Sequence, residues 1–202
     1  MKLYYLPGAC SLATCISLLE AGQKFEAFAV SRGEKRTADG KDYLTINPKG
    51  YVPALVLDNG EVLTENVAVL SYVATLNPAA KLAPPVGTLG YFRVVEWLAF
   101  ISTEVHKNFG MLFKPGQDEA VKKMAKENLQ MRLGFVEKAL GDKTWLTGDD
   151  YTVADAYLGV VLSWSPRVGV DLIDKPKVTA YLARSKARPQ VIAARKAEGL
   201  DD

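Results

Sequence analysis

The stretch KLYYLPGACSLATCISLLEAG, residues 2–22, sets the expected fold of the first part of the chain. A strand-like run ends at Leu6, a Pro-Gly pair turns the chain, and a helical spacing of apolar residues follows over residues 11–21. Gly22 stands directly after that spacing, where helices commonly end. The order of strand, turn and helix predicts an α/β arrangement with Cys10 at the start of the helix.

Cys10 occupies a position where backbone N–H groups have no partner within the helix and favour an anion. We therefore expect this thiol to ionise more readily than a free cysteine, whose pKa is about 8.5. Two alternatives remain open. The helix start could present a substrate's thiolate to a neighbouring hydroxyl such as Ser11, or Cys10 could be a small apolar filler. Cys15, within the helical pattern, is predicted to pack in the core.

The remainder of the first 76 residues alternates strand and helix patterns. FEAFAV (residues 25–30) is interpreted as a second strand, and ALVLDNGEVL (residues 54–63) as a hairpin around an Asp-Asn-Gly turn. Thr64 is expected to cap the helix that follows over residues 67–76. The predicted order is β-α-β, a variable segment, and then β-β-α.

Beyond residue 76 the pattern becomes wholly helical. NPAAKLAPPVGT (residues 77–88) contains three prolines and one glycine and is interpreted as a linker. Helical spacing then covers residues 94–109, 119–140 and 152–164. The last of these begins with Thr-Val-Ala-Asp, which has the spacing of a capping box. The predicted fold class is a small α/β domain followed by an all-α domain.

Composition and charge narrow the classes of function. The 202 residues are 49% hydrophobic and 24% charged, which is typical of a globular protein, and the net charge of +2 provides no basic footprint for nucleic acid. No apolar run approaches the roughly 18 residues of a membrane helix. The N-terminus lacks a signal pattern and the two cysteines fit a reducing compartment, so we expect a cytoplasmic protein. One histidine and two separated cysteines do not form a metal site, so we expect none.

Two further motifs could bind a ligand. In INPKGYVPAL (residues 46–55), Pro53 opens a strand, where it cannot donate to a sheet. A cis peptide there would leave the backbone of Val52 free for an extended ligand, and an ordinary trans proline is the alternative. In LTENVAVL (residues 63–70), a helix start could bind a carboxylate while Glu65 holds an ammonium group, and a solvated cap is the alternative.

His106 is the only histidine in the chain. It lies in a predicted helix with one apolar stripe at positions 94, 98, 101 and 105. A second stripe of small or polar residues comprises Ala99, Thr103, His106 and Gly110. We expect the second stripe to leave a groove into which His106 projects; a structural histidine beside an apolar helix is the alternative.

Together these motifs resemble a known family. The β-α-β and β-β-α order, with a thiol after the first strand and Val-Pro before the third, resembles the thioredoxin fold. With the helical remainder, the whole chain resembles a cytosolic glutathione transferase of the bacterial beta class. The segments that carry the resemblance are KLYYLPGACSL, KRTADGKDYLTINPKGYVPAL, LTEN, WLAFISTEVHK and ARKAEGL. It implies a thioredoxin-like glutathione-binding domain over residues 1–77, a linker over 78–88 and an all-helical domain over 89–202 that lines the electrophile site.

The resemblance also implies roles for particular residues. Cys10 would lie beside the glutathione sulfur, where it can form a mixed disulfide, and His106 would belong to a basic pair, with Lys107, that faces the active-site cleft. Cys10 and His106 are the expected catalytic residues. Substrate contacts are expected from these residues: Lys35 near the glycine carboxylate; Tyr51 and Val52, ahead of a cis Pro53, along the tripeptide backbone; Glu65 and Asn66 at the γ-glutamyl end; and Thr103, Glu104 and Lys107 on the first helix of the second domain. Members are usually homodimers, in which Glu104 would reach the partner's glutathione site.

The expected function is conjugation of glutathione, as co-substrate, to small apolar electrophiles, with thiol transfer through Cys10 as a second activity. The alternative is a non-catalytic, ligandin-like binding protein for apolar molecules. Its cleft would be filled by apolar side chains of the helical domain, including Phe109, Phe113 and Trp164.

Overall fold

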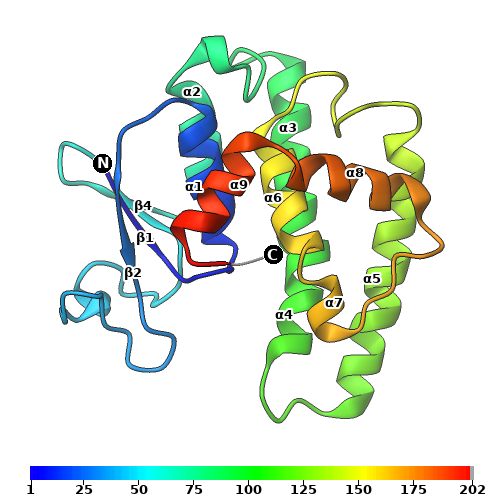
Figure 1. The fold of residues 1–202 in the computed structure, drawn as a ribbon, viewed down its shortest axis with the longest axis horizontal. Helices are drawn as coiled ribbons and strands as arrows, with labels where there is room; N and C mark the ends of the chain where they lie inside the picture. Colours follow the sequence, from blue (N-terminus) through cyan, green and yellow to red (C-terminus); the bar gives the residue numbers. More distant parts are fainter. Residues whose placement is uncertain (201–202) are drawn as a thin grey trace.

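A computed structural model describes residues 1–200 of the chain (Figure 1). Its sheet has four strands in the order β2-β1-β3-β4: β1 (Lys2–Tyr5), β2 (Glu26–Ala29), β3 (Ala54–Val56) and β4 (Val62–Thr64). β1 is parallel to β2 and antiparallel to β3, and β3 and β4 form the predicted hairpin. Leu3 pairs with Ala27 on one side and Leu55 on the other, so it lies at the centre of the sheet.

Two helices, α1 (Ser11–Glu20) and α2 (Asn66–Thr75), pack together against the sheet (Figure 1). Leu3 and Leu55 from the sheet, together with Ile16 from α1, are fully or almost fully buried between these elements. A smaller cluster of Val30, Tyr43 and Ala54, with Tyr4 packed against it, is separate from that core. This is the thioredoxin-like arrangement that the sequence predicted.

The start of α2 corrects one expectation. Thr64 is the last residue of β4 and pairs with Ala54, so it does not cap the helix. The cap position falls to Glu65, whose φ of 69° lies in the left-handed region and whose side chain makes no capping hydrogen bond. The hydroxyl of Thr64 instead accepts a hydrogen bond from Lys49 Nζ at 3.1 Å. Sheet pairing, which a local capping signal cannot reveal, fixed this boundary.

The rest of the chain is helical, as predicted. It contains η2 (Pro78–Ala80), α3 (Leu89–Phe100), η3 (Ile101–His106), α4 (Lys107–Phe113), α5 (Glu119–Leu140), α6 (Val153–Leu162), α7 (Ser165–Val168), α8 (Pro176–Lys186) and α9 (Pro189–Ala197). All ten residues of α6 are buried, so this helix forms the centre of the second domain. None of the helices within residues 1–200 is both long enough and apolar enough to cross a membrane.

The helix predicted over residues 94–109 is interrupted. Its middle, η3, is a π-helical turn. Each hydrogen bond of such a turn spans five residues instead of four, so the turn advances the chain less per residue. A side-chain spacing of 3.6 residues carried across this turn therefore loses register. The consequence for the stripe around His106 is described below.

The capping box at α6 is present as predicted. The Oδ2 atom of Asp155 accepts hydrogen bonds from Thr152 N at 2.9 Å and from Thr152 Oγ1 at 2.8 Å. Oδ1 accepts from Leu146 N at 2.9 Å and from the hydroxyl of Tyr181 at 3.1 Å. Asp155 is fully buried, so one carboxylate joins the start of α6, the loop before it and α8.

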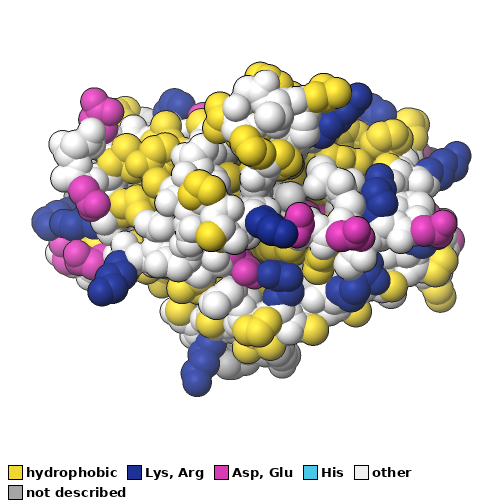
Figure 2. Space-filling model, turned by 90° about the horizontal axis from the view of Figure 1, so that it is seen from above, with side chains coloured by type: hydrophobic (Ala, Val, Ile, Leu, Met, Phe, Trp, Pro, Cys, Tyr) yellow, Lys and Arg dark blue, Asp and Glu magenta, His cyan; other side chains and the backbone are white. Residues whose placement is uncertain are grey.

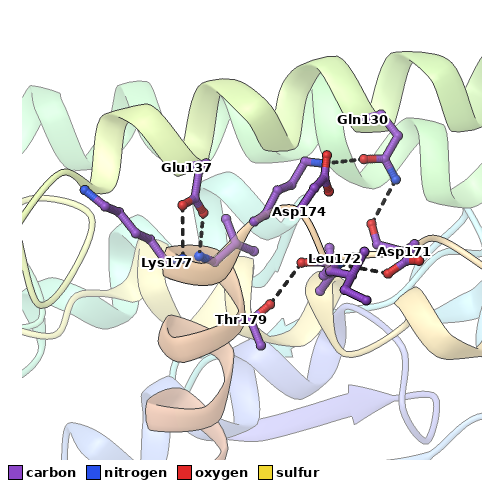
Figure 3. Close-up of polar contacts among 10 residues, drawn as sticks. Gln130, Glu137, Asp171, Leu172, Asp174, Lys177 and Thr179 are labelled. Carbon is purple, nitrogen blue, oxygen red and sulfur yellow. Dashed lines mark hydrogen bonds and ion pairs between the residues drawn. The ribbon is translucent and has the colours of Figure 1, made fainter.

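Polar contacts also attach α8 to α5 (Figure 3). The carboxylate of Glu137 accepts hydrogen bonds from the backbone N–H groups of Lys177 at 3.0 Å and Val178 at 2.8 Å. Lys175, which is buried, donates from Nζ to the side chains of Gln130 and Asp174. The first turn of α8 is thus capped by a residue 40 positions earlier in the chain.

The end of the chain returns to the first domain, where α9 packs against α1 (Figure 1). Arg188 donates from Nε and Nη2 to the carboxylate of Glu20 at 2.8 and 2.9 Å. Its guanidinium also lies 3.9 Å from the ring centroid of Tyr151. Figure 2 shows one face of the molecule, on which basic and acidic side chains are interspersed and neither sign gathers into a patch.

Candidate active site

A cavity of about 1310 Å³ lies between the two domains. Its first wall is formed by the turn before α1, the loop before β3 and the start of α2, including Cys10, Val52 and Glu65. Its second wall comes from η3, α4, α6 and α7, including His106 and Trp164. The topology therefore brings together the motifs that the sequence placed on separate segments.

Cys10 lines the cavity directly before the first residue of α1. Its Sγ donates a hydrogen bond to the carbonyl oxygen of Val52 at 3.3 Å. Burial raises the pKa of the Cys10 thiol to about 12, although the backbone N–H groups of Cys10 and Ser11 act to lower it. The expectation that this thiol ionises readily is therefore wrong, because the cost of desolvating a thiolate outweighs the effect of the helix start.

The hydroxyl of Ser11 is engaged within the turn that precedes α1. It accepts a hydrogen bond from Leu6 N at 3.2 Å and donates to Leu6 O at 3.4 Å. Ser11 is fully buried and is not among the cavity-lining residues. The alternative in which this hydroxyl faces a bound thiolate is therefore wrong. Cys15 is buried in the core, as predicted.

The loop before β3 contains the cis peptide bond between Val52 and Pro53 that the resemblance implied. The carbonyl oxygen of Tyr51 accepts hydrogen bonds from the hydroxyl of Tyr43 at 2.6 Å and from Asn47 Nδ2 at 2.7 Å. Lys35 Nζ donates to Gly50 O at 2.9 Å. These contacts hold the loop in place, and Lys35, Tyr51, Val52 and Pro53 all line the cavity.

Glu65 and Asn66 have different environments at the start of α2. Asn66 is buried: its Oδ1 accepts from Thr14 Oγ1 at 3.1 Å and its Nδ2 donates to Cys10 O at 3.3 Å. Its side chain therefore joins the starts of α1 and α2. Glu65 is exposed, and its carboxylate forms an ion pair with Lys49 Nζ at 2.7 Å. A ligand would meet the carboxylate of Glu65 and the backbone of Asn66.

His106 projects into the cavity as expected, and its Nδ1 lies 2.6 Å from the hydroxyl of Tyr157. The rings of His106 and Trp164 meet edge to face with centroids 5.0 Å apart. Burial, together with Lys107, lowers the pKa of His106 to about 4, so the imidazole is neutral at pH 7. Tyr157, on α6, was not predicted; a phenol in a helix buried on all sides requires a polar partner, and that signal could have identified it.

Two residues of the predicted small and polar stripe lie outside the cavity. The lining residues of this segment are Ser102, His106, Lys107 and Gly110, whereas Ala99 and Thr103 are not among them. Thr103 is exposed and donates to Ala99 O at 3.1 Å. The π-helical turn explains the difference, because it shifts the face that a regular helix would present. Glu104 also lies outside the cavity lining, in an ion pair with Arg132 at 2.8 Å.

Two residues from the second half of the chain hold the turn that carries Cys10. Trp164 Nε1 donates to Gly8 O at 2.9 Å, and the carboxylate of Glu198 accepts from Gly8 N at 2.9 Å. Gly8 has a φ of 68°, a conformation that favours glycine. Glu198 follows α9 directly in sequence, and sequence reasoning gave it no role of its own.

Glu198 should make stability depend on pH. Burial raises the pKa of its carboxyl group to about 7 from an ordinary value of 4.5. A raised pKa means that the folded state holds this proton more tightly, so the stabilisation is complete below pH 4.5 and is lost as the pH rises through 7. Glu198→Gln should remove this loss, a difference of roughly 1–3 kcal/mol between pH 5 and 8. Urea unfolding at several pH values measures the free energy of unfolding of the natural chain and of Glu198→Gln. If the two proteins lose stability equally between pH 5 and 8, Glu198 is not the cause of the loss.

A thioredoxin-like domain joined to a helical domain, with a thiol and a cis-proline loop facing a shared cavity, defines a class of thiol-handling proteins. Family models support a narrower assignment. The glutathione S-transferase N-terminal domain matches residues 1–75 and the C-terminal domain matches residues 97–189.

Individual relatives agree over the full chain. Glutathione S-transferase GstA of Escherichia coli O157:H7 is 44% identical over 200 residues, covering 99% of this chain and all of the relative. The ternary complex of BphK, a bacterial GST, superposes with a TM-score of 0.98 at 46% identity, over 99% of this chain and 100% of that one. The beta-class enzyme of Sphingomonas chungbukensis gives a TM-score of 0.96 at 46% identity, over 100% of both chains. The chain belongs to the glutathione S-transferase family, and its structural neighbours include a bacterial beta-class member.

Proposed function

We propose that this transferase conjugates glutathione to small apolar electrophiles, with the tripeptide along the first wall of the cavity and the electrophile against the second. The observation that carries this proposal is the shared cavity itself. It combines Cys10, the backbone of Val52 and the start of α2 on one side with His106 and Trp164 on the other. A related enzyme of a sphingomonad, 45% identical with a TM-score of 0.96, is described as complexed with glutathione.

The charged groups of the cavity complement those of glutathione in one orientation. The γ-glutamyl end carries a carboxylate and an ammonium group, which match the backbone N–H groups at the start of α2 and the carboxylate of Glu65. Lys35 and Lys107 line the cavity and would hold the glycine carboxylate. The backbone of Val52 would pair with the tripeptide between them, in the manner of an added strand.

Conjugation requires glutathione as a thiolate. The backbone N–H groups at the start of α1 would stabilise that anion, and Cys10 would lie beside it. The thiolate attacks the electrophilic carbon: a C–S bond forms, the leaving group departs with its electron pair, and the thiol proton passes to solvent. His106 is neutral at pH 7 and would act as a hydrogen-bonding partner, held by Tyr157, instead of as a cation.

Thiol transfer through Cys10 is a second, slower activity in this proposal. The thiolate of Cys10 would attack glutathione disulfide, so that the S–S bond breaks, a mixed disulfide forms and one glutathione leaves as thiolate. A second glutathione would release Cys10. The raised pKa of Cys10 leaves little thiolate at neutral pH, so conjugation is expected to dominate.

We also propose a cytoplasmic homodimer. Exposed Phe92 on α3 and exposed Met131 and Phe135 on α5 supply apolar surface outside the cavity. The ring of Phe135 contacts Trp97 and Phe100, with centroids 5.9 and 5.2 Å away. The exposed ring of Phe135, packed on the rings of α3, would favour a protein interface on this side of the molecule. The ion pair of Glu104 with Arg132, the residue after Met131, would place Glu104 close to that interface.

The test measures the rate at which the protein conjugates glutathione to chlorodinitrobenzene. Chloride release and the absorbance of the product report this rate. Turnover well above the uncatalysed rate supports the proposal. A non-catalytic carrier of apolar molecules is not favoured by relatives named as transferases. Tight binding of apolar ligands with no turnover of any electrophile would nevertheless establish it.

Glutathione binding should depend on Glu65. Glu65→Gln keeps the shape of the side chain but removes the charge that would face the substrate's ammonium group. We expect the KM for glutathione to rise roughly tenfold, which corresponds to about 1.4 kcal/mol. Glu61→Gln, at an exposed position of the β3-β4 hairpin, is the matched control and should not change KM. Equal KM values for the two variants would contradict the role assigned to Glu65.

A further inference from the structure

The cavity lining is strongly cationic. Among residues 1–200 it contains one carboxylate, Glu65, and six cationic side chains: Arg32, Lys35, Lys49, Lys107, Lys114 and Arg167. Lys49 is paired with Glu65, and Lys35 donates to a backbone carbonyl. Glutathione, with its own two carboxylates and one ammonium group, accounts for the cations on the first wall and for Lys107 at the start of α4. It does not account for Lys114 and Arg167.

Lys114 and Arg167 both belong to the helical wall of the cavity. Arg167 is on α7, and Lys114 directly follows α4. Both residues are exposed, and within residues 1–200 neither forms an ion pair with a carboxylate. The guanidinium of Arg167 lies 5.7 Å from the ring centroid of Phe113. A Cβ atom added to Gly8 would lie 3.7 Å from Nη1 of Arg167. The guanidinium therefore borders the turn that leads to Cys10.

The wall beside these cations is aromatic. The rings of Phe113 and Trp164 meet edge to face, with centroids 5.7 Å apart and planes at 84°. Met111 and Val121 also line the cavity. Trp164 is fixed by its hydrogen bond to Gly8 O, so this wall is held against the thiol side of the cavity. An aromatic ring of the electrophile could pack against Phe113 and Trp164 here, close to Cys10 and to the proposed position of the glutathione sulfur.

We propose that the preferred electrophile is an aromatic compound that carries a carboxylate or sulfonate, bound by Arg167 with a contribution from Lys114. This inference rests on the proposed conjugation and differs from it in one respect, because the apolar aromatic body of the electrophile now carries an anionic group. A guanidinium can bind a carboxylate or sulfonate with two parallel hydrogen bonds, and its contact with Phe113 keeps it over the aromatic wall. In the reaction the sulfur–carbon bond forms and the carbon–halogen bond breaks, halide leaves with the electron pair, and the anionic group is unchanged.

The test compares a para-chloro-dinitrobenzoate with its methyl ester, each rate divided by its uncatalysed rate with glutathione. We expect the natural chain to have a higher normalised kcat/KM for the carboxylate. Arg167→Gln should lower that value roughly tenfold, as loss of a charge-assisted contact would, and change the ester less than about twofold. Arg167→Lys should retain part of the preference. Lys138→Gln, the same charge change on α5 outside the cavity, is the control and should alter neither rate.

The outcomes separate this inference from the proposed function. Turnover of both compounds, with no carboxylate preference and no effect of Arg167→Gln, overturns the anionic subsite and leaves conjugation intact. If neither compound is turned over, conjugation fails, and calorimetry with the two preformed glutathione conjugates decides the subsite. If Arg167→Gln raises the Kd for the carboxylate conjugate about tenfold, the anionic subsite is supported. If the Kd is unchanged, the anionic subsite is overturned.

Discussion

The Cys10→Ala protein is expected to gain no glutathione from glutathione disulfide, whereas the natural chain gains one, which a reductant removes. The cavity places Cys10 beside the backbone of Val52, where the proposal puts the tripeptide, while Cys15 is buried in the core. Intact mass before and after reduction, followed by peptide mapping, measures the adduct. Binding of reduced glutathione should be largely retained in the variant.

The rate of this reaction should also depend steeply on pH. Because the pKa of Cys10 is raised to about 12, the thiolate is a small fraction at neutral pH. Its amount, and with it the adduct rate, should rise roughly tenfold per unit between pH 7 and 10. Cys15→Ala is the matched control and should react like the natural chain. An adduct that persists in Cys10→Ala would refute the role of this thiol.

Asp155→Ala is expected to destabilise the fold by about 4 kcal/mol, because it leaves several buried hydrogen-bonding groups without their partner. The carboxylate accepts from the backbone of Leu146 and Thr152 and from the hydroxyls of Thr152 and Tyr181. Burial raises the pKa of Asp155, and these four contacts oppose that effect. Urea unfolding, followed by fluorescence and circular dichroism, measures the loss.

Two further variants make this prediction decisive. Asp155→Asn keeps the size and one acceptor oxygen and should lose about half as much stability, so it remains measurable if the alanine protein does not fold. Asp150→Ala is the control: it removes an exposed carboxylate that forms a surface ion pair with Lys81 at 3.7 Å, and its effect on stability should be close to zero. A loss below about 1 kcal/mol for Asp155→Ala would show that the network is not a major source of stability.

Local sequence signals determined most of the architecture. The apolar periods, the Asp-Asn-Gly hairpin and the capping box at Thr152 predicted strands and helices that the structure contains. The positions of Cys10 and His106 in one cavity followed from the order of these elements and from the family resemblance. Such signals succeed because hydrogen bonds within a turn, a hairpin or a cap involve residues close together in sequence.

Only the tertiary structure decided the electrostatics and the long-range contacts of the site. Burial, which no local pattern records, reversed the expected pKa shift of Cys10 and left His106 neutral beside Tyr157. The π-helical turn moved Thr103 out of the cavity. Glu137 caps a helix 40 residues later, and Glu198 holds a glycine 190 positions earlier. These features arise when distant segments pack together and exclude water, so their energies depend on neighbours that the linear sequence does not place.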